Sequence, residues 1–166
     1  MDEEREYGRA EGKAFRLLTL RAHSEKELRA KLRAGGFATT VVEEVVRRCR
    51  ELGYLNDEAF ARQRARVLAV SRLAGDRRIT LDLRERGIDA ELCQRVIAEV
   101  RGELGEEEAV ERLLRKKTRG RPVAALDERE KARLARGLMG KGFSTGLILK
   151  ILKKTEEEGF HDDDGE

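Results

Sequence analysis

The sequence has no tryptophan, few other aromatic residues and a single proline, and each of these shortages restricts the fold. Aromatic residues make up 4% of the 166 residues, whereas charged residues make up 42%. These proportions argue against one thick core, because too few bulky apolar groups are present to fill it. The lone proline, Pro122, leaves long helices uninterrupted. Thin layers of Leu, Val, Ile and Ala between helices suit this composition best.

Cysteine and histidine are also scarce, with two of each. Cys49 and Cys93 lie far apart at apolar helical positions, so we expect reduced thiols in a core rather than a disulfide or a metal site. His23 precedes a helix-capping serine and His161 lies in an acidic tail, so neither has a catalytic setting. No phosphate-binding loop and no nucleophile with a base is found. The sequence therefore predicts no enzyme and no cofactor.

Long apolar stretches are missing as well. None approaches the roughly 20 residues that a membrane-spanning helix needs. The first residues, MDEEREYGRAEG, are acidic and lack the apolar run of a signal peptide. We therefore expect a cytoplasmic protein with no membrane contact.

Charge is abundant but unevenly distributed, although the net charge is only +3. Between residues 62 and 86, eight arginines stand against three acids. Residues 112–121 form a second basic run without an acid, and residues 156–166 hold seven acids and no Lys or Arg. Such blocks favour polyanionic or acidic partners.

One helical unit occurs three times in the chain. When Gly36, Gly87 and Gly142 are aligned, apolar residues recur at the same offsets before and after each glycine. Leu28, Ile79 and Leu134 precede the glycines by eight residues, and Phe37, Ile88 and Phe143 follow directly. The spacings between Gly36, Gly87 and Gly142 are typical of helical repeats.

Each copy is expected to contain three helices, with the glycine closing the middle helix in a left-handed conformation. Ser24 and Glu27 form a capping box, and Asp76 and Asp127 are the expected helix starts in the other copies. For the last helix of each copy we expect caps from Asp89 and Ser144, and in the first copy from Thr39 or Thr40. In the first helices, the inward residues are expected to be Phe15, Leu17, Leu18, Phe60, Ala61, Val67, Leu68, Val110, Leu113 and Leu114.

The predicted fold is all-α, with three tandem three-helix repeats that stack into an elongated, curved array. We expect a flexible N-terminal segment at 1–12, repeats at 13–56, 57–101 and 102–155, and a disordered acidic tail at 156–166.

Three motifs in order resemble the RecX family, the regulatory proteins of the bacterial recombinase RecA. They are LRAHSEKELRAKLRAGGF in the first repeat, LGYLNDEAFA at the first junction and GDRRITLDLRERGI in the second repeat. The third repeat is more divergent and retains mainly KGFSTGLILKIL, after an insertion-like TRGRPVAALDERE. The resemblance spans roughly residues 14–154.

The resemblance implies a three-repeat helical protein that lies in the groove of the RecA filament on DNA. It implies inhibition or modulation of RecA ATP hydrolysis, strand exchange and filament growth in recombinational DNA repair. We expect a monomer with the RecA filament as its partner, and with single- or double-stranded DNA as a further partner through its phosphates. Two other functions stay open: a protein that binds free DNA through phosphate contacts alone, and a scaffold for other helical proteins.

The basic residues are the candidate binding site for the filament or for DNA phosphates. Arginine suits carboxylates and phosphates alike, and the alternative is a solvated helix face with intrahelical partners. For the second basic run, the alternative is a helix C-terminus that attracts cations. GYLND at residues 53–57 is interpreted as a structural turn. The candidates are Arg62, Arg66, Arg72, Arg77, Arg78, Arg84, Arg115, Lys116, Lys117 and Arg119.

Overall fold

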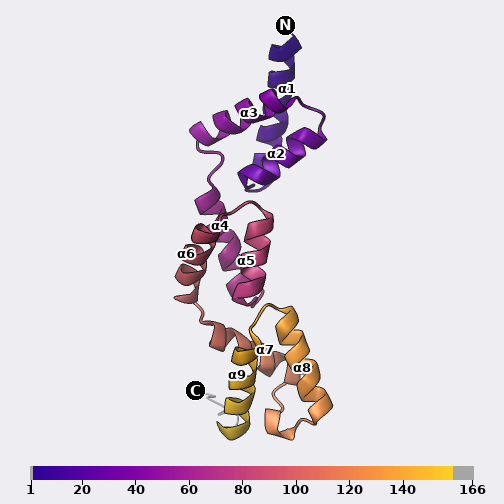
Figure 1. The fold of residues 1–166 in the computed structure, drawn as a ribbon, viewed down its shortest axis with the longest axis vertical. Helices are drawn as coiled ribbons and strands as arrows, with labels where there is room; N and C mark the ends of the chain where they lie inside the picture. Colours follow the sequence, from indigo (N-terminus) through magenta and orange to yellow (C-terminus); the bar gives the residue numbers. More distant parts are fainter. Residues whose placement is uncertain (1, 159–166) are drawn as a thin grey trace. The chain divides into compact units, whose positions relative to one another are not determined.

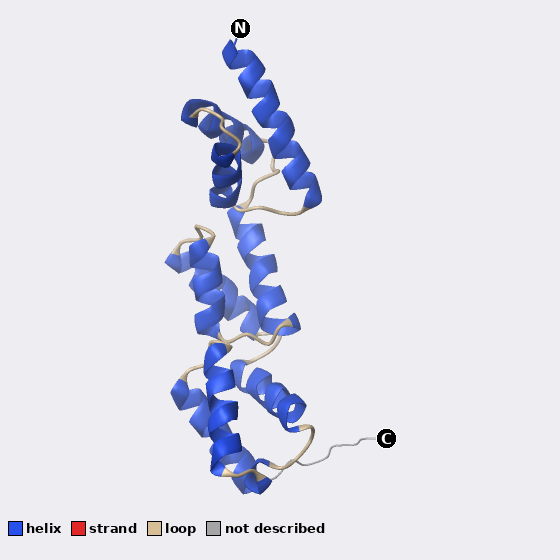
Figure 2. Cartoon of the chain, turned by 90° about the vertical axis from the view of Figure 1, so that its right-hand side faces the viewer, coloured by secondary structure: helices blue, strands red, loops and turns tan. Residues whose placement is uncertain are grey.

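A computed structural model describes residues 2–158, and within them every regular element is helical (Figures 1 and 2). The first three helices are α1 (Asp2–Leu20), α2 (Glu25–Ala34) and α3 (Thr39–Glu51). They are followed by α4 (Asp57–Arg66), a π-helix η1 (Val67–Ser71), α5 (Asp76–Glu85) and α6 (Ala90–Arg101). The last are α7 (Glu106–Thr118), a 3₁₀ turn η2 (Val123–Ala125), α8 (Glu128–Gly140) and α9 (Thr145–Glu158). The predicted all-α class is confirmed, while the elongated, curved array stays a prediction.

The chain divides into two compact units. The first contains residues 1–64 and 82–93, and its core lies where α1, α2 and α3 pack together. Ala10, Leu28, Val42, Val45 and Cys49 are fully buried there. Small and β-branched side chains predominate, which is the thin layer that the composition predicts.

The second unit contains residues 65–81 and 94–166. Its core is formed by α7, α8 and α9 with η2, and Leu114, Leu138, Phe143 and Ile151 lie at its centre, each at most 1% exposed. Val123 is also fully buried. The insertion-like segment before α8 therefore contributes to the core and is not a free loop.

The repeated glycine closes the middle helix in all three copies, as predicted. Gly36, Gly87 and Gly142 have φ of 83°, 84° and 96°, a region that costs other residues about 1–2 kcal/mol. At Gly87 an added Cβ would lie 2.8 Å from Lys26 Cβ, and at Gly142 it would lie 2.5 Å from the Arg78 amide nitrogen. At Gly36 it would meet nothing within 4 Å. In the second and third copies, the glycine turn therefore also packs against the start of the preceding middle helix.

The junctions between repeats have a second feature in common. The Glu25 amide at the start of α2 donates to Asp57 at the start of α4, at 2.9 Å, within the first unit. The Asp76 amide at the start of α5 donates to Glu106 at the start of α7, also at 2.9 Å, within the second unit. In each junction, an acid of the next repeat satisfies an amide that a helix N-terminus leaves unpaired. Asn56 accepts from the Ala59 amide at 3.0 Å and caps α4, so the structural interpretation of GYLND agrees with these contacts.

Most of the predicted caps are present, with one exception. The capping boxes of Ser24 with Glu27 and of Asp127 with Glu130 are both formed. Asp89 accepts from the Leu92 amide and Ser144 from the Leu147 amide. The cap predicted from Thr39 or Thr40 is wrong, because α3 begins at Thr39 and its N-cap, Ala38, has no side chain that can accept.

Three further expectations are corrected. Residues 2–12 are helical rather than a flexible segment, because α1 begins at Asp2 and buries Ala10 completely in the first core. Val67 is 37% exposed, because the π-helix that it begins shifts the helical register relative to Phe60 and Ala61. Residues 156–158 continue α9, and the rest of the predicted acidic tail, 159–166, lies outside the described residues.

Candidate functional site: basic surfaces of the two units

The most constrained basic segment is the stretch Arg72–Arg78, which follows η1 and includes the first turn of α5, and is here called the basic loop. It contains Leu73, whose φ of 50° lies in the left-handed region that a branched side chain rarely adopts. Leu73 packs against the core of the second unit, and the neighbouring Ala74 is 4% exposed. A non-glycine residue persists in this conformation only where the surroundings fix it.

Hydrogen bonds supply that constraint along the whole basic loop. The Ala74 amide donates to the Leu68 carbonyl at 2.8 Å, and the Gly75 amide donates to the Lys141 carbonyl at 2.8 Å. The Arg77 amide donates to the Gly142 carbonyl at 3.2 Å. The Lys141 ammonium returns a bond of 2.7 Å to the Arg72 carbonyl. The basic loop is therefore held on the turn between α8 and α9.

Arg101 supports the basic loop from α6. Its guanidinium donates to the Ala74 carbonyl and to the Asp76 carboxylate, both at 2.8 Å, and to the Leu104 carbonyl at 3.2 Å. One planar fork thus fixes three points of the backbone and side chains around the loop. Arg101 has a structural role, although its charge alone does not distinguish it from the predicted binding residues.

The three arginines of the basic loop are directed to solvent. Arg72, Arg77 and Arg78 are exposed, and none of them forms an ion pair within the described residues. Arg77 and Arg78 also lie in the first turn of α5, where the helix dipole disfavours cations. A rigid backbone therefore presents three cations whose charge the protein itself does not neutralise.

The other predicted arginines of this region differ from these three. Arg62 pairs with Glu58 at 3.0 Å, and Arg66 pairs with Glu103 at 2.9 Å. Arg84 donates to the Ile88 carbonyl at 3.3 Å. The expectation that the excess charge of residues 62–86 is not compensated is therefore wrong for Arg62 and Arg66, because carboxylates from outside this stretch pair with them.

A partly buried ion-pair network in the first unit accounts for two further arginines. Arg64 binds both Asp82 oxygens at 2.8 Å, and Arg86 binds Asp82 at 2.9 Å. Arg86 also reaches Glu27, the capping acid of α2, at 2.5 Å. The hydrogen bonds from Arg64 hold the pKa of Asp82 well below its usual value, so this carboxylate stays ionised. The network is structural and leaves these charges unavailable to a partner.

The second basic run ends α7 and continues into the turn that follows. Arg115, Lys116, Lys117 and Arg119 are all exposed. Arg119 closes the helix with φ of 54°, a conformation normally taken by glycine. A pocket of about 380 Å³ lies beside it, lined by Lys117, Arg119, Arg121, Arg133 and the single acid Glu130, together with Thr118, Leu126 and Leu134. The Thr118 hydroxyl is buried and has no hydrogen-bond partner within the described residues. This end of α7 is therefore basic and exposed, as the sequence predicts, and it borders a pocket.

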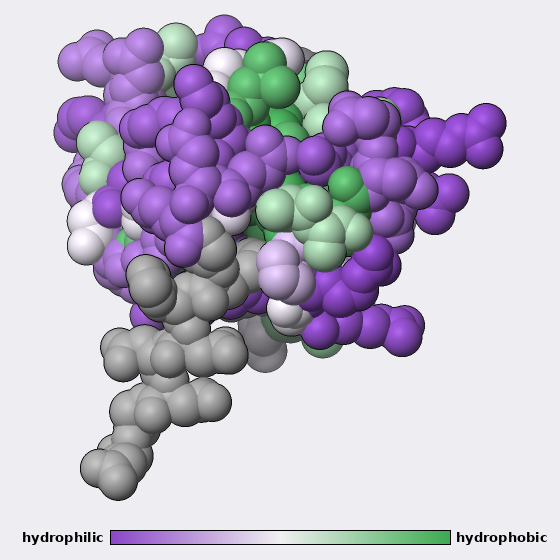
Figure 3. Space-filling view, turned by 90° about the horizontal axis from the view of Figure 1, so that it is seen from below, coloured by the Kyte–Doolittle hydropathy of each residue, from purple (hydrophilic) through white to green (hydrophobic). Residues whose placement is uncertain are grey.

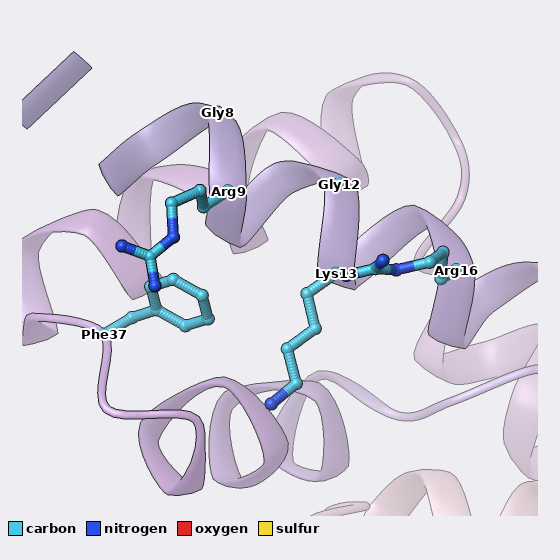
Figure 4. A pocket seen from close by; sticks show the side chains of 6 residues that line it. All are labelled: Gly8, Arg9, Gly12, Lys13, Arg16 and Phe37. Carbon is cyan, nitrogen blue, oxygen red and sulfur yellow. The ribbon is translucent and has the colours of Figure 1, made fainter. Parts of the chain in front are cut away.

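One group of basic residues was missed in the sequence. A pocket of about 520 Å³ in the first unit is lined by Gly8, Arg9, Gly12, Lys13, Arg16 and Phe37 (Figure 4). We call it the α1 pocket, since five of its six residues belong to α1. Glycines four residues apart within a helix, with cations at similar spacing, were the signal that would have revealed it.

Some classes of site are not found in the part of the chain that the structure describes. No group of His, Cys, Asp or Glu in residues 2–158 is arranged to hold a metal ion. None of the helices within that range is both long and apolar enough to cross a membrane. His23 is buried and bonded to the Arg21 carbonyl and Lys31, and Ser24 caps α2.

The face seen in Figure 3 is covered mainly by hydrophilic residues, with a smaller hydrophobic group between them.

Comparison with known proteins gives a consistent result. Models of the first, second and third three-helix domains of RecX match residues 10–49, 56–97 and 105–152. A regulatory protein RecX of Syntrophotalea carbinolica is 31% identical over 141 residues, covering 85% of this chain and 92% of the relative. A regulatory protein RecX of Thermus thermophilus is 36% identical over 146 residues, covering 88% and 92%.

Solved structures support the fold. The crystal structure of RecX from Lactobacillus salivarius superimposes with a TM-score of 0.77 at 20% identity, covering 93% of this chain and 99% of that one. A second crystal structure of a regulatory protein RecX gives a TM-score of 0.74 at 21% identity, covering 92% and 74%.

Proposed function

Because the chain belongs to the RecX family, we propose that it is a regulator that binds the RecA filament on DNA and restrains its activity. The activities restrained would be ATP hydrolysis, strand exchange and filament growth. In this proposal the protein acts by binding alone, because a bound protein can regulate an ATPase without catalysing a reaction itself. The RecA filament is the partner that the family resemblance implies.

The basic loop is the observation that supports this proposal most directly. Arg72, Arg77 and Arg78 are exposed and carry no ion pair within residues 2–158, while the backbone beneath them is fixed by at least four hydrogen bonds. Because the backbone is already fixed, only the arginine side chains have to become ordered when they bind a carboxylate or a phosphate. A filament of protein on DNA offers both kinds of anion. The exposed Arg115, Lys116, Lys117 and Arg119 at the end of α7 form a second candidate contact.

The repeated architecture fits a partner that is itself a repeating polymer. In the proposed mechanism, three similar units contact successive RecA subunits. Bridging neighbouring subunits would oppose the motions that accompany ATP turnover, and occupation of the groove would hinder incoming duplex DNA. Once one unit is bound, the other units are held near the filament at a high effective concentration. Each individual contact can therefore be weak while the whole protein binds tightly.

The test measures DNA-dependent ATP hydrolysis by RecA at rising concentrations of the protein, with binding to the same DNA measured separately without RecA. We expect inhibition at concentrations well below those that bind bare DNA. The variant Arg72→Gln/Arg77→Gln/Arg78→Gln should raise the half-inhibitory concentration about tenfold or more, with unchanged helicity.

The matched control changes three arginines that already have carboxylate partners and lie on no candidate surface, Arg33, Arg47 and Arg48, to glutamine. It removes the same total charge, so an equal effect of both variants would assign the inhibition to net charge and not to the basic loop. Normal inhibition by the first variant would remove the basic loop from the proposal. Inhibition only where the DNA is already coated would favour the second candidate function, a protein that competes for DNA through phosphate contacts.

A further inference from the structure

We propose that the α1 pocket binds the phosphate backbone of a nucleic-acid strand. The inference concerns the first unit and does not rest on the proposed function, since it requires no RecA. Neither the composition of the basic runs nor the family resemblance assigns these residues.

The cations of the α1 pocket follow one face of the helix. Arg9, Lys13 and Arg16 are separated by four and three residues, which places them about 6 and 4.5 Å apart along the helix axis. Arg9 and Arg16 are exposed and Lys13 is half-buried. No acid lines this pocket. Asp2 and Glu6 line a neighbouring pocket that shares Arg9 and Phe37 with the α1 pocket, and Glu6 accepts the Ala38 amide at 2.7 Å.

Phe37 holds two of these cations in place. The Arg9 guanidinium carbon and the Lys13 ammonium each lie 5.9 Å from the centre of its ring (Figure 4). This distance is within the range of a cation–π interaction, which is worth about 0.5–1 kcal/mol at exposed sites. Lys13 also lies against Gly35, where an added Cβ would be 2.5 Å from its ammonium nitrogen, at the C-terminus of α2. The cations are thus oriented before any ligand arrives, and neither has a carboxylate partner within the described residues.

Gly8 and Gly12 give the pocket its shape. Each glycine within a helix costs about 0.5–1 kcal/mol relative to alanine. An added Cβ at either position would meet nothing within 4 Å, so no packing inside the protein explains them. Both line the α1 pocket beside the three cations, where the missing side chains leave a low strip of helix backbone. A ligand can therefore approach the helix closely beside the cations.

A nucleic-acid strand satisfies these features together. Its charges follow one another at regular short intervals, as the three cations do, and arginine forks match phosphate oxygens in pairs. A narrow sugar–phosphate chain can lie along the glycine strip, whereas an acidic peptide directs successive side chains to different sides of its backbone. The phosphate backbone is therefore favoured over an acidic protein segment.

The experiment measures binding of the full chain to a short, fluorescently labelled single-stranded oligonucleotide without RecA, by anisotropy over a range of salt concentrations. For Arg9→Gln/Lys13→Gln/Arg16→Gln we expect at least about tenfold weaker binding at low salt. The slope of log affinity against log salt should decrease by about 2, since each lost phosphate contact contributes about 0.7 on a single strand. The control Arg33→Gln/Arg47→Gln/Arg48→Gln makes the same charge change in the same unit, at arginines paired with Glu43 and Glu51, and should lower the slope by much less.

A second variant tests the shape of the pocket without altering charge. Gly8→Leu/Gly12→Leu should keep or raise the helicity and stability, because it removes two helix glycines at open positions. It should nevertheless weaken oligonucleotide binding several-fold by filling the strip. Equal salt slopes for the two triple variants, normal binding by the leucine variant, or no binding by the unaltered chain would each overturn the assignment. If the variant Arg9→Gln/Lys13→Gln/Arg16→Gln lost binding to a polyglutamate peptide but bound the oligonucleotide normally, the assignment would also be overturned. The pocket would then be assigned to an acidic protein segment.

Discussion

Replacing glycine by alanine at three positions would separate two costs in the free energy of unfolding, that of a strained backbone and that of close packing. Gly36 has φ of 83°, but its added Cβ would meet nothing within 4 Å. Gly75 is not among the glycines with positive φ, but its Cβ would lie 2.5 Å from the Gly142 carbonyl oxygen. Gly142 combines both conditions, with φ of 96° and a Cβ 2.5 Å from the Arg78 amide nitrogen.

The expected losses in the free energy of unfolding follow from these geometries. Alanine in the left-handed region costs about 1–2 kcal/mol, which is the expectation for Gly36→Ala. Overlap with backbone atoms, which cannot rotate away as a side chain can, costs about 1–3 kcal/mol and applies to Gly75→Ala. Gly142→Ala should lose about 2–5 kcal/mol, because strain and overlap add.

The assay is urea unfolding followed by far-ultraviolet circular dichroism, with a separate measurement of RecA inhibition. Gly142→Ala should also weaken inhibition, because the turn that it distorts holds the amides of Gly75 and Arg77 in the basic loop. The double variant at Gly75 and Gly142 should lose less than the sum of the single variants, since the two glycines touch one another. Equal losses for Gly36→Ala and Gly142→Ala would refute the reasoning, because the close approach would then contribute nothing.

Three further predictions concern polar groups in the first unit. Burial lowers the pKa of His23, so stability should be lost as the pH falls below the ordinary value of 6.5, and His23→Gln should remove this step in urea midpoints measured against pH. Hydrogen bonds from Arg64 lower the pKa of Asp82. Its contribution to the free energy of unfolding is therefore present above pH 3.8 and is lost as the pH falls through the lower pKa of the folded protein. Asp82→Asn should therefore cost about 1–2 kcal/mol at neutral pH and flatten the loss in acid; an unchanged acid profile would contradict this role. Asn56→Ala should cost about 1 kcal/mol in the same urea assay by removing the cap of α4, and a loss equal to that of a surface substitution would contradict the cap.

Features that depend on local spacing could be predicted from the sequence. The offset of each apolar residue from its glycine predicts which face is buried, and the structure buries Leu28, Ile79, Ile88 and Phe143 accordingly. Capping boxes are also local, since the cap and its partner are three residues apart. The second function of the same glycine, at Gly87 and Gly142, depends on contacts with Lys26 and Arg78 far away in the sequence, so no local pattern reveals it.

The wrong expectations have equally local causes. A period of 3.6 residues places Val67 inward, but one wider turn of π-helix at Val67–Ser71 moves it to 37% exposure. Charge and glycine content favour a flexible segment at residues 2–12, whereas burial of Ala10 stabilises a helix there. Alanine gives no hydrophobic signal strong enough to predict this burial from sequence.

Candidate binding residues were harder to predict, because a sequence counts charges but does not pair them. Arg66 and Arg72 lie in the same basic stretch, and the sequence does not distinguish them. In the structure, Arg66 pairs with Glu103, which lies 37 residues later, and Arg72 has no ion pair within the described residues. Arg9, Lys13 and Arg16 were overlooked because four acids precede them and dilute the local charge. Their significance appears only in the structure, where Asp2 and Glu6 border a neighbouring pocket and no acid lines the α1 pocket.

Internal pairing changes what a net charge of +3 means for this chain. Most arginines of the first unit are neutralised by carboxylates, among them Arg29, Arg33, Arg50 and Arg64, so average charge predicts neither where nor how strongly a partner binds. The charge that stays available includes two surfaces, the α1 pocket in the first unit and the basic loop in the second. Since each surface lies within one unit, either can be altered while the other stays intact. If the α1 pocket binds DNA and the basic loop binds RecA, the two triple variants should affect oligonucleotide affinity and ATPase inhibition separately, whereas a competitor for DNA alone would lose both activities in parallel.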